Sequence, residues 1–170
     1  MDKTLIVTDV QKGFINRWTE HIPARIAELI RKAQFDDQLF TKFLNEPESP
    51  FERILGWDRL KDSPETDLVP ELQEFARKVF VKTGYSAFQA QGFEEYLRVN
   101  KLKDLYIVGI DTDVCVLKTA VDAFEKGFHP RVLTDYCASS RGLKMHKAGL
   151  SVLKRFIGEK NLLSGPIEVL

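Results

Sequence analysis

The stretch from Asp104 to Gly127 restricts the fold of this 170-residue chain more than any other segment. Its first part, Leu105–Gly109, is an apolar run of the kind that forms a strand buried on both faces of a parallel sheet. From Val114 to Phe124, apolar residues recur at three- and four-residue steps, which predicts a helix. The expected apolar face of this helix consists of Val114, Leu117, Val121 and Phe124.

The turn between this strand and this helix, residues 110–113, puts Cys115 in the first turn of the predicted helix. Thr112 and Asp113 are both residue types that cap helix N-termini. Ligands of open α/β sheets bind at the carboxyl ends of the strands. The helix dipole and the free amides there favour a thiolate over a thiol. Cys115 is therefore a candidate nucleophile.

Strand-like and helix-like segments alternate along the rest of the chain. Strands are expected at residues 4–8, 38–44, 78–82, 105–109, 131–134 and 167–170, with helices at 22–33, 68–75, 93–99, 114–124 and 144–156. This alternation predicts one α/β domain over residues 1–170. We expect a three-layer α/β/α sandwich with a mostly parallel, six-stranded, Rossmann-like sheet in the order 3-2-1-4-5-6.

Residues 45–66 form the longest irregular segment, and a loop of this length in a compact domain usually covers a site. A short helix within it is expected to press four side chains onto one surface: Phe51, Ile54, Leu55 and Trp57.

The charge balance excludes some classes of partner. Lys and Arg together number 25, as do Asp and Glu, so there is no reason to expect nucleic acid or an anionic membrane. The chain has no apolar run of about 18 residues that would span a bilayer, and its first residues show no signal-peptide pattern. Two cysteines, Cys115 and Cys137, do not make a disulfide framework. We therefore expect a reduced, cytoplasmic protein in which Cys137 packs as a small apolar residue.

The familiar catalytic motifs are missing from the sequence. It contains no dinucleotide-binding or P-loop glycine pattern, no Gly-x-Ser-x-Gly elbow and no Cys-x-x-Cys or His-Glu-x-x-His metal motif. The three histidines, His21, His129 and His146, are scattered, and none follows a predicted strand. This distribution favours surface or structural roles for them and argues against a Cys–His dyad.

Three polar residues do stand at predicted strand ends: Asp9 after the first strand, Lys82 at the end of the third and Cys115 after the fourth. Together they would make a nucleophilic site, with Asp9 accepting the thiol proton and Lys82 stabilising either negative charge. Backbone amides at the start of the Cys115 helix would bind an oxyanion. Strand-end polar residues also serve as caps, and cysteines also pack in cores, so the spacing alone leaves both interpretations open.

Three blocks, in order along the chain, form a specific pattern: residues 6–14 (Ile-Val-Thr-Asp-Val-Gln-Lys-Gly-Phe), 80–88 (Phe-Val-Lys-Thr-Gly-Tyr-Ser-Ala-Phe) and 108–116 (Val-Gly-Ile-Asp-Thr-Asp-Val-Cys-Val). Further matches follow at Thr119, Ala120, Asp122, Ala123, Gly127, Asp135, Cys137, Ala138, Ser139 and His146. With these motifs the chain resembles the isochorismatase-like cysteine hydrolases, which include nicotinamidases and carbamoyl-amide hydrolases. The resemblance covers nearly the whole chain.

This resemblance implies a catalytic triad in which Cys115 is the nucleophile, Asp9 the general base and Lys82 the residue that tunes both. It also implies a cis peptide between Ile110 and Asp111, which would turn the Asp111 amide toward the Cys115 amide to form an oxyanion hole. The implied reaction cleaves the C–N bond of a small carboxamide through a thioester.

Two departures from the family pattern narrow the resemblance to a metal-independent branch. Nicotinamidases of the family hold a metal through an Asp-x-His motif and a further His after the second strand, whereas residues 42–47 read Lys-Phe-Leu-Asn-Glu-Pro here. No metal or other cofactor is therefore expected, and nicotinamidase activity is in doubt. Isochorismatases themselves lack the nucleophilic cysteine, so Cys115 argues against their chemistry.

Aromatic residues near these motifs are expected to wall a small pocket for a planar acyl group: Phe14, Trp57, Tyr85 and Phe88. Burial in the core is the alternative for Trp57 and Phe88. The side chain of Asp111 either faces solvent or binds a cationic or amide end of the substrate.

The family resemblance implies self-association as a dimer or tetramer. The alternative function is a non-catalytic or redox-sensing interaction protein of the same fold.

Overall fold

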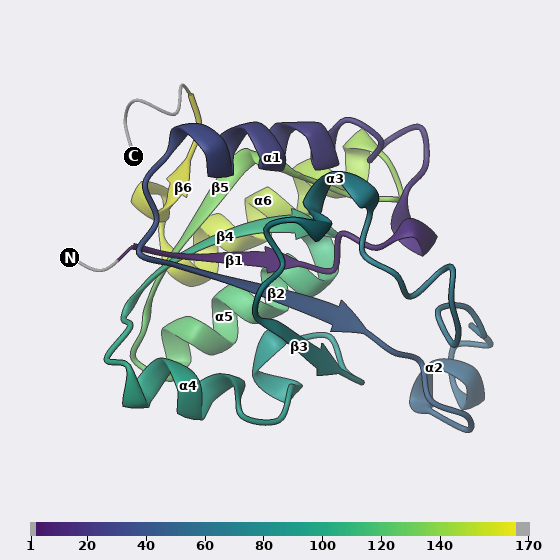
Figure 1. Cartoon of the computed structure of the whole chain (residues 1–170). Helices are drawn as coiled ribbons and strands as arrows, with labels where there is room; N and C mark the ends of the chain where they lie inside the picture. The colour runs from purple at the N-terminus through teal and green to yellow at the C-terminus, as the bar shows by residue number, and fades with distance from the viewer. Residues whose placement is uncertain (1–2, 166–170) are drawn as a thin grey trace.

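The computed structural model of the chain describes residues 3–165. Its sheet is entirely parallel, and its strand order, β3-β2-β1-β4-β5-β6, confirms the predicted topology (Figure 1). The strands are β1 (Lys3–Thr8), β2 (Asp37–Phe43), β3 (Val79–Lys82), β4 (Asp104–Ile110), β5 (His129–Ala138) and β6 (Leu162–Leu163). The last predicted strand, at 167–170, lies outside the described residues, and β6 takes the sixth place in the sheet.

Helices cover both faces of this sheet (Figure 1). They are α1 (Ile22–Lys32), α2 (Pro50–Arg53), α3 (Pro70–Gln73), α4 (Phe93–Val99), α5 (Leu117–Glu125) and α6 (Leu143–Ile157), with short turns η1 (Lys12–Phe14), η2 (Ala87–Gln89), η3 (Thr112–Val116) and η4 (Glu159–Asn161). Helices α1 and α3 pack on one face, and α4, α5 and α6 pack on the other. None of the helices within residues 3–165 is long and apolar enough to cross a membrane.

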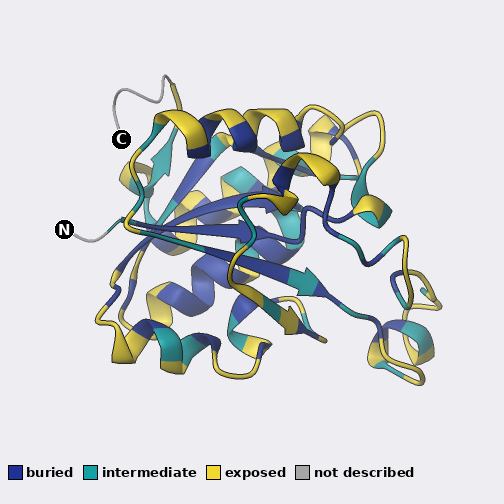
Figure 2. Cartoon of the chain, viewed as in Figure 1, coloured by how far each residue is buried: buried dark blue, intermediate teal, exposed yellow. Residues whose placement is uncertain are grey.

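Successive side chains of the central strands point alternately into two separate hydrophobic cores. Leu5 and Val7 of β1 point into the core under α1, while Ile6 between them points into the core under α4 and α5. Every residue of β4 is buried, and β1 is buried from Thr4 onward (Figure 2). This two-sided burial is why β4 reads as a continuous apolar run.

The helix after β4 begins differently from the prediction. Its first turn, η3, is π-helical, with the Val116 amide donating to the Asp111 carbonyl at 3.1 Å, and Asp111 rather than Thr112 or Asp113 is the N-cap residue. A π-turn is wider than an α-turn, so it rotates the residues that follow it. The predicted apolar face is therefore only partly right: Val121 is buried and Leu117 packs against the core, but Phe124 is 53% exposed. Val116, Ala120 and Ala123, which the prediction left out, also face the core.

The irregular segment 45–66 projects beyond the carboxyl ends of the strands and carries α2 (Figure 1). The buried Gln11 side chain fixes both ends of the segment by donating to the carbonyls of Phe43 (2.9 Å) and Thr66 (3.0 Å). Phe51 is buried, as predicted, but Ile54 and Leu55 are 79% and 61% exposed. The expectation that all four apolar residues share one buried surface is therefore wrong, because α2 ends at Arg53, before Ile54 and Leu55.

Candidate active site

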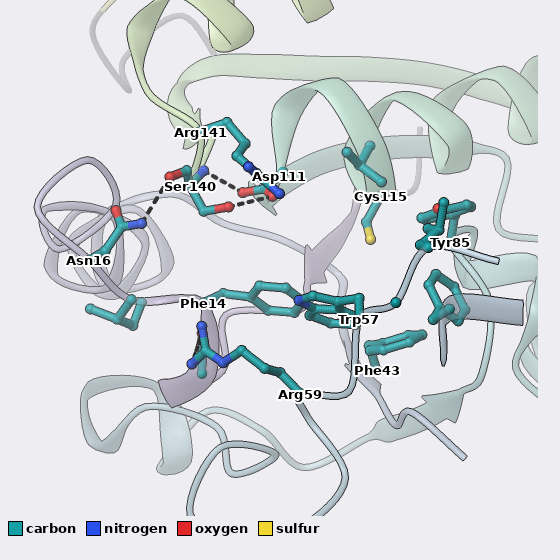
Figure 3. A pocket seen from close by; sticks show the side chains of 16 residues that line it. Phe14, Asn16, Phe43, Trp57, Arg59, Tyr85, Asp111, Cys115, Ser140 and Arg141 are labelled. Carbon is teal, nitrogen blue, oxygen red and sulfur yellow. Dashed lines mark hydrogen bonds between the residues drawn. The ribbon is translucent and has the colours of Figure 1, made fainter. Parts of the chain in front are cut away.

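A cavity of about 600 Å³ opens at the carboxyl edge of the sheet. The Cys115 side chain lies on one wall with its sulfur directed into the cavity, and the rings of Phe14 and Trp57 lie on the opposite wall (Figure 3). Its volume lies in the range of small-molecule sites. The cavity is therefore where a ligand of this fold would meet the candidate nucleophile.

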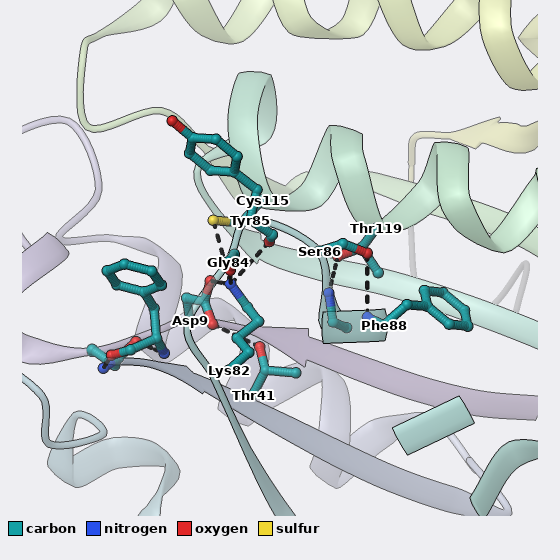
Figure 4. A network of polar contacts seen from close by, with 12 residues as sticks. Asp9, Thr41, Lys82, Gly84, Tyr85, Ser86, Phe88, Cys115 and Thr119 are labelled. Carbon is teal, nitrogen blue, oxygen red and sulfur yellow. Dashed lines mark hydrogen bonds and ion pairs between the residues drawn. The ribbon is translucent and has the colours of Figure 1, made fainter. Parts of the chain in front are cut away.

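Asp9, Lys82 and Cys115 converge beneath this cavity, although they come from three different strand ends (Figure 4). Lys82 Nζ lies 2.7 Å from Asp9 Oδ2, and both side chains have 0% exposure. The same ammonium lies 3.7 Å from Cys115 Sγ. The three residues thus form one buried cluster of a carboxylate, an ammonium and a thiol.

Backbone and hydroxyl groups hold the members of this cluster in place. Lys82 Nζ donates to the carbonyls of Gly84 and Tyr85, each at 2.9 Å, and these bonds with Asp9 match its three hydrogens. Thr41 Oγ1 donates to Asp9 Oδ1 at 2.7 Å. Asp9 has a φ of +51°, which costs about 1–2 kcal/mol for a residue with a Cβ. Backbone strain of this kind gathers at functional sites.

Burial determines the charge state of the thiol. It raises the pKa of Cys115 well above the usual value; Lys82 lowers that pKa and Asp9 raises it further. For Lys82, burial lowers the pKa, but the interactions with Asp9 and Cys115 outweigh this effect and leave it raised. The resting site therefore holds an ammonium and a neutral thiol. The thiolate expected from the helix N-terminus is therefore not the resting state, because burial raises the pKa of the Cys115 thiol.

The turn that carries Cys115 has the predicted backbone feature. The peptide bond between Ile110 and Asp111 is cis. The Asp111 carbonyl accepts from the amides of Val114 and Val116, both at 3.1 Å, which ties the turn to the start of the helix.

Helix α6 packs directly on this turn through Gly149. A Cβ at that position would lie 2.7 Å from Asp113 Cα and 2.9 Å from Asp113 N. We expect Gly149→Ala to lower the free energy of unfolding by about 1–3 kcal/mol, because the clash is with backbone. Helix propensity alone would raise it by about 1 kcal/mol. Urea denaturation measures the sign, and an unchanged or increased stability would contradict this packing.

The Asp111 side chain is bound by a residue that sequence reasoning missed. Ser140 donates to it twice, from its amide to Oδ1 at 2.6 Å and from its hydroxyl to Oδ2 at 2.7 Å. Asn16 Nδ2 in turn donates to the Ser140 carbonyl at 2.9 Å. Burial raises the pKa of Asp111 to about 6; the Ser140 bonds oppose this shift, and Asp113 and Asp9 add to it. No motif marks Ser140, although the family-like residues 135–139 end beside it.

Three of the four predicted wall residues, Phe14, Trp57 and Tyr85, line the cavity. The fourth, Phe88, packs away from it in the core under α4, with ring centroids 5.2 Å from Phe93 and 5.6 Å from Phe128. It points this way because η2 turns the chain after Ser86. The lining also includes residues that the sequence did not single out as walls of the pocket, among them Asn16, Phe43, Phe51, Arg59 and Arg141.

His21, His146 and the second cysteine, Cys137, lie outside the cluster of Asp9, Lys82 and Cys115. His146 is hydrogen-bonded through Nδ1 to Thr112 Oγ1 at 2.8 Å, and His21 is the N-cap residue of α1. Cys137 is buried, and desolvation raises its pKa to about 12. It therefore behaves as a small apolar residue.

The sequence matches the Isochorismatase domain over residues 3–159, and the chain belongs to the isochorismatase family. It is 32% identical over 104 residues to the ureidoacrylate amidohydrolase RutB of Acinetobacter baylyi, which is 61% of this chain and 40% of that protein. The chain spans less than half the length of several curated relatives that it matches. An isochorismatase-like hydrolase from Alkaliphilus metalliredigens shares the fold with a TM-score of 0.82 at 22% identity, covering 99% of this chain and 97% of that one.

A pyrazinamidase of Pyrococcus horikoshii, solved in complex with zinc, aligns with a TM-score of 0.77 at 25% identity, covering 92% of this chain and 97% of that one. Residues 3–165 contain no group of three or more His, Cys, Asp or Glu side chains placed to hold a metal. The segment after β2 also lacks histidine, since residues 42–47 read Lys-Phe-Leu-Asn-Glu-Pro.

Proposed function

We propose that the protein is a cysteine amidohydrolase that cleaves the C–N bond of a small carboxamide. The observation that carries this proposal is the buried cluster of Asp9, Lys82 and Cys115 beside an aromatic-walled cavity. Membership of a family with amidohydrolase relatives supports the same chemistry. No step of the reaction runs through a metal, because the described residues do not fit one.

In the proposed first half-reaction, Cys115 Sγ attacks the amide carbon while Asp9 takes the thiol proton. The Lys82 ammonium, 3.7 Å from the sulfur, stabilises the thiolate as it forms. The carbonyl oxygen becomes an oxyanion that the backbone amides of Asp111 and Cys115 would bind. Asp9 then gives the proton to the leaving nitrogen, the C–N bond breaks, and a thioester on Cys115 remains.

In the second half-reaction, Asp9 removes a proton from water, which attacks the thioester carbon. The C–S bond breaks, the acid leaves, and the proton returns to the sulfur. Because the resting thiol has a raised pKa, proton removal by Asp9 must accompany the attack. This requirement explains why the acid and the thiol belong to one cluster.

The test combines ammonia release from a panel of primary amides with the intact mass of the protein during turnover. We expect an added mass equal to the acyl group on the wild type, and loss of both signals in Cys115→Ala. Cys137→Ala is the matched control and is expected to retain both, because Cys137 lies outside the cluster. Ammonia release that survives unchanged in Cys115→Ala would refute the proposal.

The redox-sensing alternative has less support. Sensor cysteines are exposed and have lowered pKa values, whereas Cys115 is 6% exposed with a raised pKa. Self-association into a dimer or tetramer stays a prediction, which light scattering coupled to size-exclusion chromatography would test.

A further inference from the structure

We propose that the cavity selects amides whose acyl part carries a positively charged nitrogen, and that the Asp111 carboxylate receives this nitrogen. This inference rests on the proposed function, since it names the substrate class of the same site. It makes Asp111 a specificity-determining residue through its side chain, in addition to the oxyanion-binding role proposed for its backbone amide.

The location of Asp111 is the first observation. It lines the same cavity as Cys115, from the same turn. Figure 3 shows the two side chains on one wall, facing the rings of Phe14 and Trp57 across the cavity. A small amide with its carbonyl at Cys115 would therefore present its far end to Asp111.

The second observation is that the Asp111 carboxylate is oriented but not neutralised. Both of its bonds come from Ser140, at 2.6 and 2.7 Å, and both donors are uncharged. Within residues 3–165 no ion pair involves Asp111. Each oxygen accepts one bond and keeps further acceptor capacity. A half-buried carboxylate in this state attracts a cation more strongly than a solvated one does.

The basic residues that line the cavity do not cancel its preference for a cationic ligand. Arg59 is committed to Glu65, with Nη2 and Nε at 2.6 and 3.0 Å from its Oε1. Arg141 also lines the cavity, but it is exposed, so water screens its charge more than that of Asp111. The less solvated charge has the stronger effect on a bound ligand.

Aromatic walls favour the same ligand class. The lining contains five aromatic rings, from Phe14, Phe43, Phe51, Trp57 and Tyr85. Aromatic faces attract cations through the ring quadrupole, and this attraction grows as water is excluded. A carboxylate that forms no ion pair, beside such walls, is the combination that recognises an ammonium group.

The test separates binding from turnover by using Cys115→Ala, which keeps the cavity but lacks the nucleophile. Calorimetry would measure its dissociation constants for three primary amides of similar shape: β-alaninamide (cationic), butyramide (neutral) and succinamate (anionic). A second series, p-aminomethyl-, p-ethyl- and p-carboxybenzamide, covers a larger acyl group. We expect the cationic member of at least one series to bind about tenfold more tightly than the neutral one.

Asp111→Asn in the same background keeps the size of the side chain and removes its charge, so the cationic preference should fall to about parity. Arg141→Gln is the matched control, and it should keep or increase the preference. Tightest binding of the anionic members, no binding of either cationic probe, or a preference unchanged by Asp111→Asn would overturn the inference. Cationic binding without turnover by the wild type would instead count against the proposed function alone.

Discussion

Asp9→Asn and Lys82→Met should each lower kcat/KM for amide hydrolysis by about 10²- to 10⁴-fold, the contribution of a general acid–base group. Asn cannot accept the thiol proton. Met leaves the fully buried Asp9 without the ammonium that lies 2.7 Å away, which favours the protonated acid and removes the base. The measurement is ammonia release from the amide that the wild type hydrolyses fastest.

The free energy of unfolding distinguishes the proposed catalytic role of Asp9 and Lys82 from a purely structural one. Removing one member of a buried ion pair costs about 3–5 kcal/mol, because the other member stays buried without its partner. The double variant Asp9→Asn/Lys82→Met has no unpaired charge and should recover part of the lost free energy of unfolding. Its activity should stay low. Wild-type activity in either single variant, or activity that returns together with stability in the double variant, would contradict the proposed roles.

Gly109→Ala should lower the free energy of unfolding by about 3–4 kcal/mol, through a backbone clash and an unfavourable φ. Gly109 has a φ of +122°, and a Cβ there would lie 2.1 Å from the Thr8 carbonyl oxygen and 2.8 Å from the Thr8 amide nitrogen. Strand β4 would have to move away from β1, which also displaces Asp9 and the turn that carries Cys115. Urea denaturation measures the loss, and kcat/KM should fall with it.

Gly127→Ala is the matched control for this substitution. Gly127 also has a positive φ, of +81°, but a Cβ there would meet nothing within 4 Å. It should therefore cost only the conformational part, about 1–2 kcal/mol. Equal losses at the two positions would show that the close approach of β1 and β4 at Gly109 is not what requires glycine.

The sequence predicted the candidate catalytic cluster because its members stand at the ends of parallel strands. Once Asp9, Lys82 and Cys115 were assigned to three strand ends, the topology of the sheet brought them to one edge. The same reasoning could not find Ser140, Phe43 or Phe51. Nothing in the local pattern at these positions says which side chains turn toward the cavity, since loop geometry depends on distant anchors such as Gln11.

Two errors in the sequence prediction arose at turns, η3 and η2, whose geometry the sequence pattern does not show. The π-turn at 112–116 rotated the helix, so the periodicity read from Val114 assigned Phe124 to the core, although it is 53% exposed. Phe88 was assigned to the cavity because it follows Lys82 closely in sequence. A short turn, η2, instead directs the Phe88 side chain into the core under α4. Sequence proximity is a weak guide to direction once the chain leaves a strand.

For this protein, the residue types and their order were enough to predict a mostly parallel sheet and the meeting of an acid, a lysine and a cysteine at one of its edges. Periodicity and chain connectivity are local properties, and they limit the topology to few choices. Only the tertiary structure decided whether the resting Cys115 is a thiol or a thiolate. The helix N-terminus predicts a thiolate, but burial by the surrounding elements favours the thiol. Burial is the sum of contacts from distant segments, so no single stretch of sequence contains it.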